Sequence, residues 1–153
     1  MKSSKFDVVI LTVLDEEMEA VRNVFQEKGI ELKERVDVNN PVTSVWFEGS
    51  VGNKQVALVK ILDKRNEAAS AFVTRVIEHW KPSYLIFAGI GGGIKGKVNL
   101  GDVVFSKDVY LLGEHRDAGK VDVKSITVSS PDPVLREIAS LLKEILTLKF
   151  VRV

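Results

Sequence analysis

The chain has 153 residues, of which 45% are hydrophobic and 28% charged, a composition typical of one soluble folded domain. Its 22 Lys and Arg residues nearly balance its 21 Asp and Glu residues, and a net charge of +1 argues against a nucleic-acid or anionic-membrane partner. The absence of cysteine excludes disulfides and thiolate metal sites, and two histidines, His79 and His115, are too few for a histidine-rich metal site. We therefore expect a cytoplasmic protein without metal or cofactor.

Strand and helix patterns alternate in the first part of the chain. Residues 6–13 (FDVVILTV) form a continuous, β-branched run, which is typical of a strand buried on both faces. Residues 15–29 have helical spacing, with acids in the first turn and Gly29 placed as a C-terminal cap. Residues 43–51 and 54–62 are predicted to be two strands of a hairpin that turns at Gly52-Asn53.

The pattern continues through the middle of the chain. Residues 67–80 have a second helical stripe, and Pro82 follows where the helix is expected to stop. Residues 84–88 (YLIFA) are predicted to form another buried strand, and residues 102–109 a further strand after a glycine-rich stretch. A strand is also expected at residues 124–128. We place His115, among turn-forming and charged residues, in a surface loop.

The last segments complete a layered pattern. Pro133 fits the first turn of a third helix, and residues 148–153 have a strand pattern with no polar tail after it. The alternation predicts a three-layer α/β/α fold with a mixed, largely parallel sheet. Without a linker to divide it, residues 1–153 are expected to form a single domain, and the terminal strand suggests that this domain is C-terminally incomplete.

An acidic cluster follows the first predicted strand. Asp15, Glu16 and Glu17 lie at the junction of a buried strand and a helix, where ligands gather in open α/β sheets. A carboxylate there can act as a base or an acid. Acids in a first helical turn also offset the helix dipole, and the residues alone leave both interpretations open.

A cluster of glycines follows the strand at residues 84–88. Gly89, Gly91, Gly92 and Gly93 allow a sharp turn and a close approach of main-chain N–H groups to a ligand. The spacing fits neither GxxxxGK[ST] nor a clean GxGxxG, which argues against a phosphate loop and a dinucleotide-binding half-domain. A tight loop between strands and a ligand-contacting loop both remain possible from the pattern.

Together, the stretches "LDEEMEAV" and "KPSYLIFAGIGGGIKGKVNLGDVVFS" resemble the nucleoside phosphorylase and nucleosidase superfamily, in particular its 5′-methylthioadenosine/S-adenosylhomocysteine nucleosidase-like branch. The resemblance implies cleavage of the N-glycosidic bond of a nucleoside by phosphate or water. It implies that Glu17, with Glu16 beside it, activates water. It also implies that Gly89, Ile90, Gly91 and Gly92 contact the ribose and the nucleophile.

The departures from the family pattern refine this expectation. Phe87 and Ile90 stand where related phosphorylases place an arginine and a serine, and an acidic cluster replaces their phosphate loop. The comparison favours hydrolysis of a purine nucleoside or related nucleotide over the alternative, phosphate-dependent phosphorolysis. The family's late aspartate and ribose-binding glutamate have no counterpart up to Val153. A catalytically impaired nucleoside-binding or subunit-pairing module is therefore a second alternative, and we expect a homodimer that binds a small nucleoside.

Overall fold

The computed structural model describes residues 5–62, 66–93, 95–102, 109–117 and 120–129. They fall into two compact units, Met1–Ile90 and Gly91–Val153, which are described separately. The predicted third helix and the predicted strand at 148–153 lie outside the described residues, as does most of the predicted strand at 102–109. The single domain over residues 1–153 stays a prediction.

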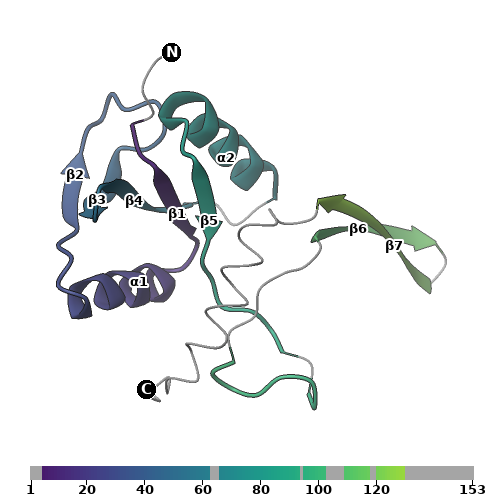
Figure 1. Cartoon of the computed structure of the whole chain (residues 1–153). Helices are drawn as coiled ribbons and strands as arrows, with labels where there is room; N and C mark the ends of the chain where they lie inside the picture. The colour runs from purple at the N-terminus through teal and green to yellow at the C-terminus, as the bar shows by residue number, and fades with distance from the viewer. Residues whose placement is uncertain (1–4, 63–65, 94, 103–108, 118–119, 130–153) are drawn as a thin grey trace. The chain divides into compact units, whose positions relative to one another are not determined.

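The first unit is built on one five-stranded sheet with the order β2-β3-β4-β1-β5 (Figure 1). Central strand β1 runs parallel to both of its neighbours, β4 and β5, whereas β3 is antiparallel to β4 and to β2. The sheet is therefore mixed, as predicted, and its parallel part surrounds β1. The strands are β1 (Val8–Thr12), β2 (Lys33–Val36), β3 (Val45–Val51), β4 (Lys54–Lys60) and β5 (Tyr84–Phe87).

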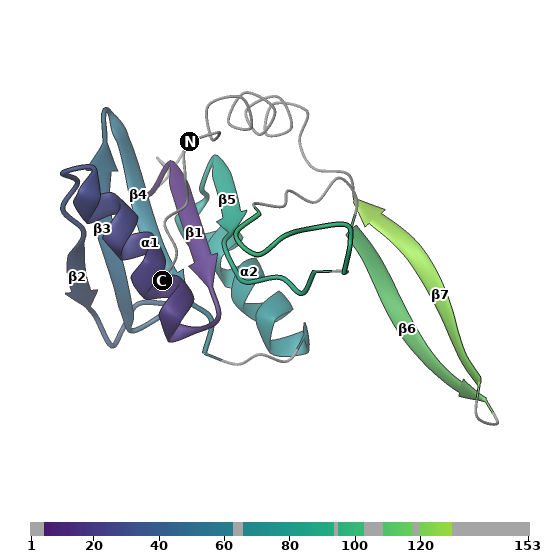
Figure 2. The same ribbon diagram turned by 90° about the horizontal axis from the view of Figure 1, so that it is seen from below.

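Two helices cover opposite faces of this sheet (Figures 1 and 2). The main core lies between the sheet and α2 (Asn66–Trp80), where Val9 and Leu11 of β1 cluster with Val76 and Trp80. Successive strand side chains point to opposite faces, so Phe47 lies on the other face from Trp46. There the guanidinium of Arg22, from α1 (Asp15–Glu27), lies 4.4 Å from the centre of the Phe47 ring. The unit is thus a helix–sheet–helix sandwich.

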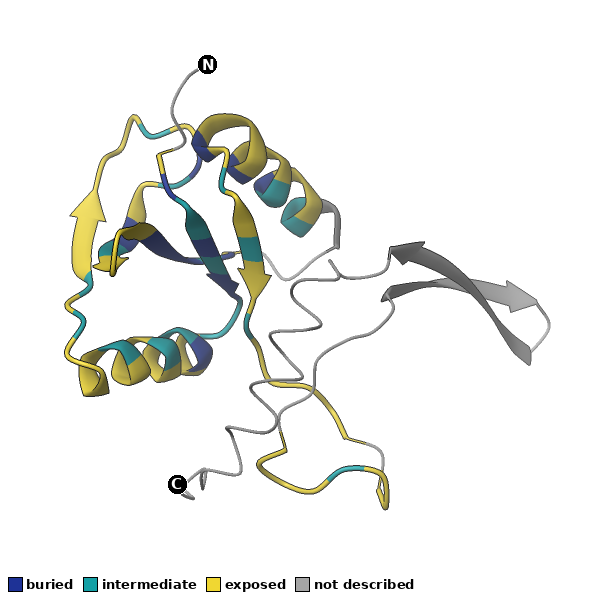
Figure 3. Ribbon diagram, in the orientation of Figure 1, coloured by how far each residue is buried: buried dark blue, intermediate teal, exposed yellow. Residues whose placement is uncertain are grey.

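The ends of the helices follow the predicted signals. Helix α1 ends at Glu27, and Gly29 adopts a left-handed φ of 71°. This backbone conformation costs free energy for a residue with a Cβ and little for glycine. Helix α2 ends at Trp80, Lys81 takes a φ of 49°, and Pro82 prevents the helix from continuing. Burial is confined to one stripe of α2, as the colours of Figure 3 show.

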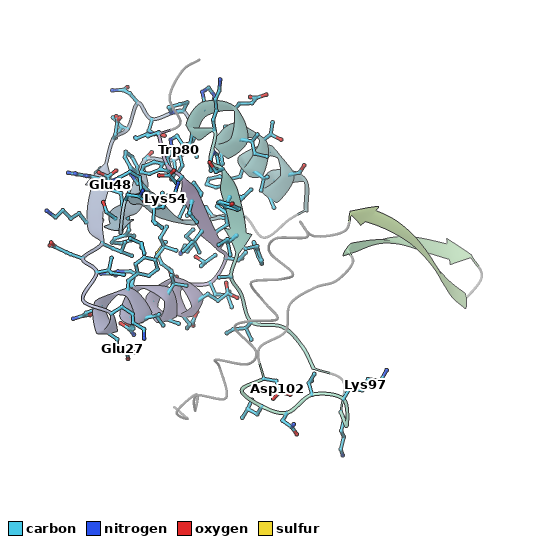
Figure 4. All side chains as sticks on the ribbon, viewed as in Figure 1. Glu27, Glu48, Lys54, Trp80, Lys97 and Asp102 are labelled. Carbon is cyan, nitrogen blue, oxygen red and sulfur yellow. The ribbon has the colours of Figure 1, made fainter. Side chains whose placement is uncertain are left out.

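An aromatic cluster fastens the end of α2 to the sheet. The Trp80 ring lies 5.0 Å from that of Phe6 and 5.8 Å from that of Trp46, and all three are buried. Lys5 places its ammonium 4.4 Å from the Trp46 ring centre. Trp46 in turn donates its indole N–H to Glu48 at 2.9 Å; Trp80 and Glu48 are labelled in Figure 4. The cluster therefore joins the last residue of α2 to the chain just before β1, where the Lys5 N–H also donates to the Trp80 carbonyl at 3.1 Å.

Strand β5 differs from its prediction. A strand buried on both faces was expected, but Tyr84 and Ile86 are each 40% exposed and Phe87 is 62% exposed. The reason is topological, because β5 is the last strand in the described sheet and pairs only with β1 there. Strand β2 was not predicted, since its four residues are all exposed and carry no apolar alternation.

The second unit contains a hairpin of two long strands, β6 (Val109–Asp117) and β7 (Lys120–Ser129). The prediction of a strand at 124–128 falls within β7. The prediction of a loop around His115 was wrong, because His115 lies within β6, in register with Asp122. Cross-strand pairing here overrides the weak strand preference of a glycine and charged residues.

No helix in the described part of the chain is long and apolar enough to cross a membrane. Within the same residues, no group of three or more histidine, cysteine or acidic side chains could hold a metal ion.

Asp7 joins three strands at the end of the sheet where β1 begins. Its carboxylate accepts hydrogen bonds from the Gln55 N–H at 2.8 Å and from Lys54 Nζ at 3.3 Å, and its carbonyl accepts from the Tyr84 N–H at 3.0 Å. The Gln55 N–H is the largest cause of a lowered Asp7 pKa; partial desolvation opposes it, and Lys54 adds to it.

Asp7→Asn is expected to destabilise the protein at neutral pH and to lose this effect in acid. A lowered pKa in the folded state contributes stability above the ordinary value of 3.8, and that contribution disappears as the pH falls through the folded value. Urea unfolding of wild type and variant at about pH 7 and about pH 3 should show the two free energies converging. The control is Glu27→Gln, at the exposed end of α1 (Figure 4), whose difference from wild type should not depend on pH in this way.

Candidate active site

The candidate site lies where three parallel strands end. Strand β1 stops at Thr12, and two residues, Val13 and Leu14, lead directly into α1. The neighbouring strands β4 and β5 run in the same direction, so their carboxyl ends meet at this edge of the sheet. The sequence forces a short connection here, because the apolar run of β1 is followed at once by the acids of the first helical turn. Such an edge is where open α/β folds place their ligands.

Glu17 is the central residue of this edge. Its Oε2 accepts hydrogen bonds from the N–H groups of Val13 and Leu14, both at 2.9 Å. Its Oε1 accepts from the N–H of Ile90 at 2.8 Å, across 73 positions of sequence. The side chain is 9% exposed. One carboxylate therefore caps the start of α1 and also holds the loop that follows β5.

The glycine at position 89 is explained by this carboxylate. A Cβ added to Gly89 would lie 3.1 Å from Glu17 Oε1 and 3.2 Å from a ring carbon of Phe87. The main chain can approach Glu17 this closely only because Gly89 has no side chain. The close approach in turn brings the next N–H, that of Ile90, within hydrogen-bonding distance.

The other predicted site residues are placed less closely. Glu16 is exposed on the first turn of α1. The Ile90 side chain is 76% exposed, so this residue contributes its main-chain N–H rather than its side chain to the contact with Glu17. Gly91 and Gly92 are exposed residues at the beginning of the second unit. The structure thus brings together Glu17, Gly89 and Ile90 from the predicted set.

Sequence analysis missed Lys60, the last residue of β4. Its Nζ forms an ion pair with Asp15 Oδ1, the first residue of α1, at 2.5 Å. The Lys60 side chain is 25% exposed and that of Asp15 83% exposed. A lysine that ends an otherwise buried strand, VALVK, was the available signal. The first turn of α1 therefore contacts the end of β4 through Asp15 and the loop after β5 through Glu17.

Thr12 was also missed. It is fully buried at the end of β1, and its hydroxyl has no hydrogen-bond partner among the described residues. Thr12 is in register with Lys60 on the neighbouring strand, so the two side chains leave the same face of the sheet. A strand position with a β-branched residue gives no sequence signal for such a hydroxyl.

Two hollows in the described surface are lined by other residues. One of about 410 Å³ is lined by residues that include Arg35 and Gln55, and one of about 420 Å³ lies against Arg22 and Gln26. Neither lining includes Glu17 or Gly89. A catalytic role for Glu17 is therefore inferred from its hydrogen bonds and from its position at the strand ends. A carboxylate fixed there can take a proton from water and can stabilise a developing positive charge.

A family model and named sequence relatives match this chain. The family model described as the phosphorylase superfamily matches residues 7–150. A 5′-methylthioadenosine/S-adenosylhomocysteine nucleosidase from an Exiguobacterium species is 36% identical over 103 residues, and one from Bacillus licheniformis is 30% identical over 103 residues. Each match covers 67% of this chain and 40% of the relative. The matched part of the chain therefore spans less than half the length of these relatives.

Solved structures agree on the fold. A Helicobacter pylori 5′-methylthioadenosine/S-adenosylhomocysteine nucleosidase superposes with a TM-score of 0.71 at 15% identity, covering 96% of this chain and 62% of that one. Futalosine hydrolase from the same organism gives a TM-score of 0.70 at 15% identity, covering 95% and 60%. These likenesses confirm the predicted layered α/β fold.

Glu17→Ala is expected to lower the free energy of unfolding by about 2–4 kcal/mol, because three main-chain N–H groups lose a charged acceptor at once. Glu16→Ala, its exposed neighbour, should change it by no more than about 0.5 kcal/mol. Urea denaturation monitored by tryptophan fluorescence measures both. Equal effects of the two substitutions would show that the contacts of Glu17 do not support the fold.

Gly89→Ala should destabilise the protein by about 1 kcal/mol relative to Gly91→Ala, because the new methyl group displaces the Glu17 carboxylate by a few tenths of an ångström. At Gly91, an added Cβ meets no described atom within 4 Å. Both changes reduce the entropy of the unfolded chain equally, so the difference reports the close contacts of position 89 with Glu17 and with the Phe87 ring. Denaturation curves that coincide for the two variants would contradict this account of Gly89.

Proposed function

We propose that this chain, which belongs to the phosphorylase superfamily, carries part of the site of a hydrolase that cleaves the N-glycosidic bond of a purine nucleoside. Glu17 is the group that activates the water. The observation that carries the proposal is the hydrogen bond between Glu17 Oε1 and the Ile90 N–H, because it joins the acid to the glycine loop. The activity is proposed for the whole protein, since the chain spans 40% of the curated relatives that it matches.

The names of the relatives support hydrolysis of nucleosides in general. Both sequence relatives are named as nucleosidases, and two fold neighbours are a nucleosidase and a futalosine hydrolase. The ligand of the H. pylori nucleosidase joins an aminopyrrolopyrimidine to a hydroxypyrrolidine, which have the shapes of a purine base and a sugar ring. A purine nucleoside is the substrate class that we carry over to this chain.

The chemistry assigned to Glu17 is general base catalysis. The carboxylate takes a proton from a water molecule, the water oxygen forms a bond to C1′ of the ribose, and the C1′–N bond breaks with its electron pair going to the base. The ribosyl centre becomes positively charged as this bond lengthens, and a nearby carboxylate stabilises that charge. The departing purine must then gain a proton, and we assign the source of this proton to solvent or to a group outside the described residues.

Residues 87 and 90 favour water over phosphate as the nucleophile. Neither Phe87 nor Ile90 can bind a phosphate oxygen with its side chain. The nearby carboxylates of Asp15, Glu16 and Glu17 would repel a phosphate anion. Phosphorolysis is therefore the disfavoured member of the pair, and its dependence on added phosphate distinguishes it.

A second candidate is a subunit-pairing module without catalysis. It is favoured by the apolar residues Tyr84, Ile86 and Phe87, which are exposed on β5, the last strand of the described sheet. An edge strand of this kind can pair with another copy of the chain, as in the homodimer that we propose for the protein.

Release of adenine from methylthioadenosine, S-adenosylhomocysteine and adenosine, with and without phosphate, tests the enzyme. Wild type should release adenine without phosphate, and Glu17→Gln should lower the rate by about 10²–10⁴-fold, the usual contribution of a general base. The control is Glu27→Gln at the exposed end of α1, which should retain the wild-type rate.

The alternatives give different results. A rate that requires phosphate indicates a phosphorylase. No adenine from the folded whole protein, together with a dimer in sedimentation, supports the pairing module and would falsify the hydrolase.

A further inference from the structure

We propose that Lys60 is a positioning residue for Glu17: through Asp15 it fixes the first turn of α1, and so aims the Glu17 carboxylate at the loop after β5. The assignment to catalysis rests on the proposed function, whereas the effect of Lys60 on Glu17 does not. No substrate contact is assigned to Lys60.

The first step is the geometry of the helix start. Asp15 and Glu17 are two residues apart on the same helical turn, so their side chains leave α1 in different directions. Asp15 reaches Lys60 at the end of β4, and Glu17 reaches Ile90 beyond the end of β5. Strand β1 lies between β4 and β5. The turn is therefore held on both sides of the strand from which it emerges.

Contacts within the first turn of α1 differ from those that join it to other strands. Val13 and Leu14 are the only residues between β1 and α1, and both of their N–H groups donate to Glu17 Oε2. These two bonds are local and move with the turn, so they do not fix its direction relative to the rest of the sheet. The Lys60–Asp15 pair and the Glu17–Ile90 bond do fix it, because each joins the turn to a different strand end. Loss of the first removes the ion pair that joins the turn to the end of β4.

The third step is energetic. Asp15 is largely exposed, and an ion pair with an exposed partner contributes little to global stability. A positioning role therefore predicts a local effect without a global one. The Ile90 amide reports that effect, because its hydrogen bond to Glu17 spans from the loop to the turn. Hydrogen exchange at this amide measures how often the bond opens.

The test is Ile90 amide exchange, measured by NMR on the full chain. Lys60→Met keeps the length of the side chain and removes its charge, and it should accelerate Ile90 exchange by about three- to tenfold. Asp15→Asn should have a similar effect, and Glu17→Gln should give the fastest Ile90 exchange of these variants. Lys60→Arg, which keeps the charge, should retain the wild-type rate of Ile90 exchange.

Thr12→Val provides the matched control. It lies in register with Lys60, keeps the volume of the side chain and removes only a hydroxyl that has no partner. Its Ile90 exchange should equal that of wild type. The unfolding midpoint of every variant is measured alongside, so that a general loss of stability is recognised.

Two results would overturn the proposal. One is an Ile90 exchange rate in Lys60→Met and Asp15→Asn that matches wild type. The other is an acceleration shared equally by amides throughout the first unit, which would mean that Lys60 only stabilises the fold.

Activity provides a separate readout. In an active wild type, Lys60→Met should lower kcat by about three- to tenfold with little change in KM, because Lys60 acts through the base and not on the substrate. An unchanged kcat would remove the catalytic part of the proposal. Wild type without activity, but with an Ile90 amide that responds to Lys60→Met, overturns the proposed function and leaves the positioning of Glu17 by Lys60 standing.

Discussion

One carboxylate, that of Glu17, joins the strand–helix junction after β1 to the loop after β5. Glu17 receives N–H groups from the strand–helix junction, at Val13 and Leu14, and from the loop after β5, at Ile90. Each of these donors would otherwise lack a partner in secondary structure, because each lies beyond the end of a strand or at the start of a helix. A buried carboxylate in turn needs such donors in place of water. The acid and the loop stabilise each other, and a side chain at position 89 would press on the Glu17 carboxylate that joins them.

The two edges of the sheet have opposite characters. Strand β2 presents Lys33, Glu34 and Arg35, all exposed, and charges of this kind discourage pairing with another strand. Strand β5 instead exposes apolar side chains, among them Ile86 and Phe87. The candidate site lies at the carboxyl end of this second, apolar edge. Any chain that covers β5, from the same protein or from another copy, would therefore also approach the site.

Much of this arrangement could be predicted from local patterns. The strands at β1, β3, β4 and β5 and both helices followed from apolar spacing, turn glycines and acids at a helix start, all of which act within a few residues. The proposal that Glu17 activates water came from a family resemblance, and the expectation of space in the glycine loop from the cost of ordering glycine.

The features that were missed depend on tertiary pairing. The partnership of Lys60 with Asp15 depends on the placement of β4 beside β1, which no local pattern encodes. Strand β2 exists because β3 pairs with it, although its own residues give no strand signal. The exposure of β5 depends on its position at the edge of the described sheet. The placement of His115 in β6 likewise follows from the pairing of that strand with β7.

The structural and the proposed chemical roles of Glu17 support each other. A base is effective when it is held in one orientation before the substrate arrives, since no free energy is then needed to order it during the reaction. The N–H groups that cap α1 and close the loop hold both oxygens of Glu17 in this way. The donor at residue 90 is a main-chain group, so isoleucine supplies it as well as serine would. Isoleucine in place of the serine of related phosphorylases therefore leaves the contact between the loop and the acid intact.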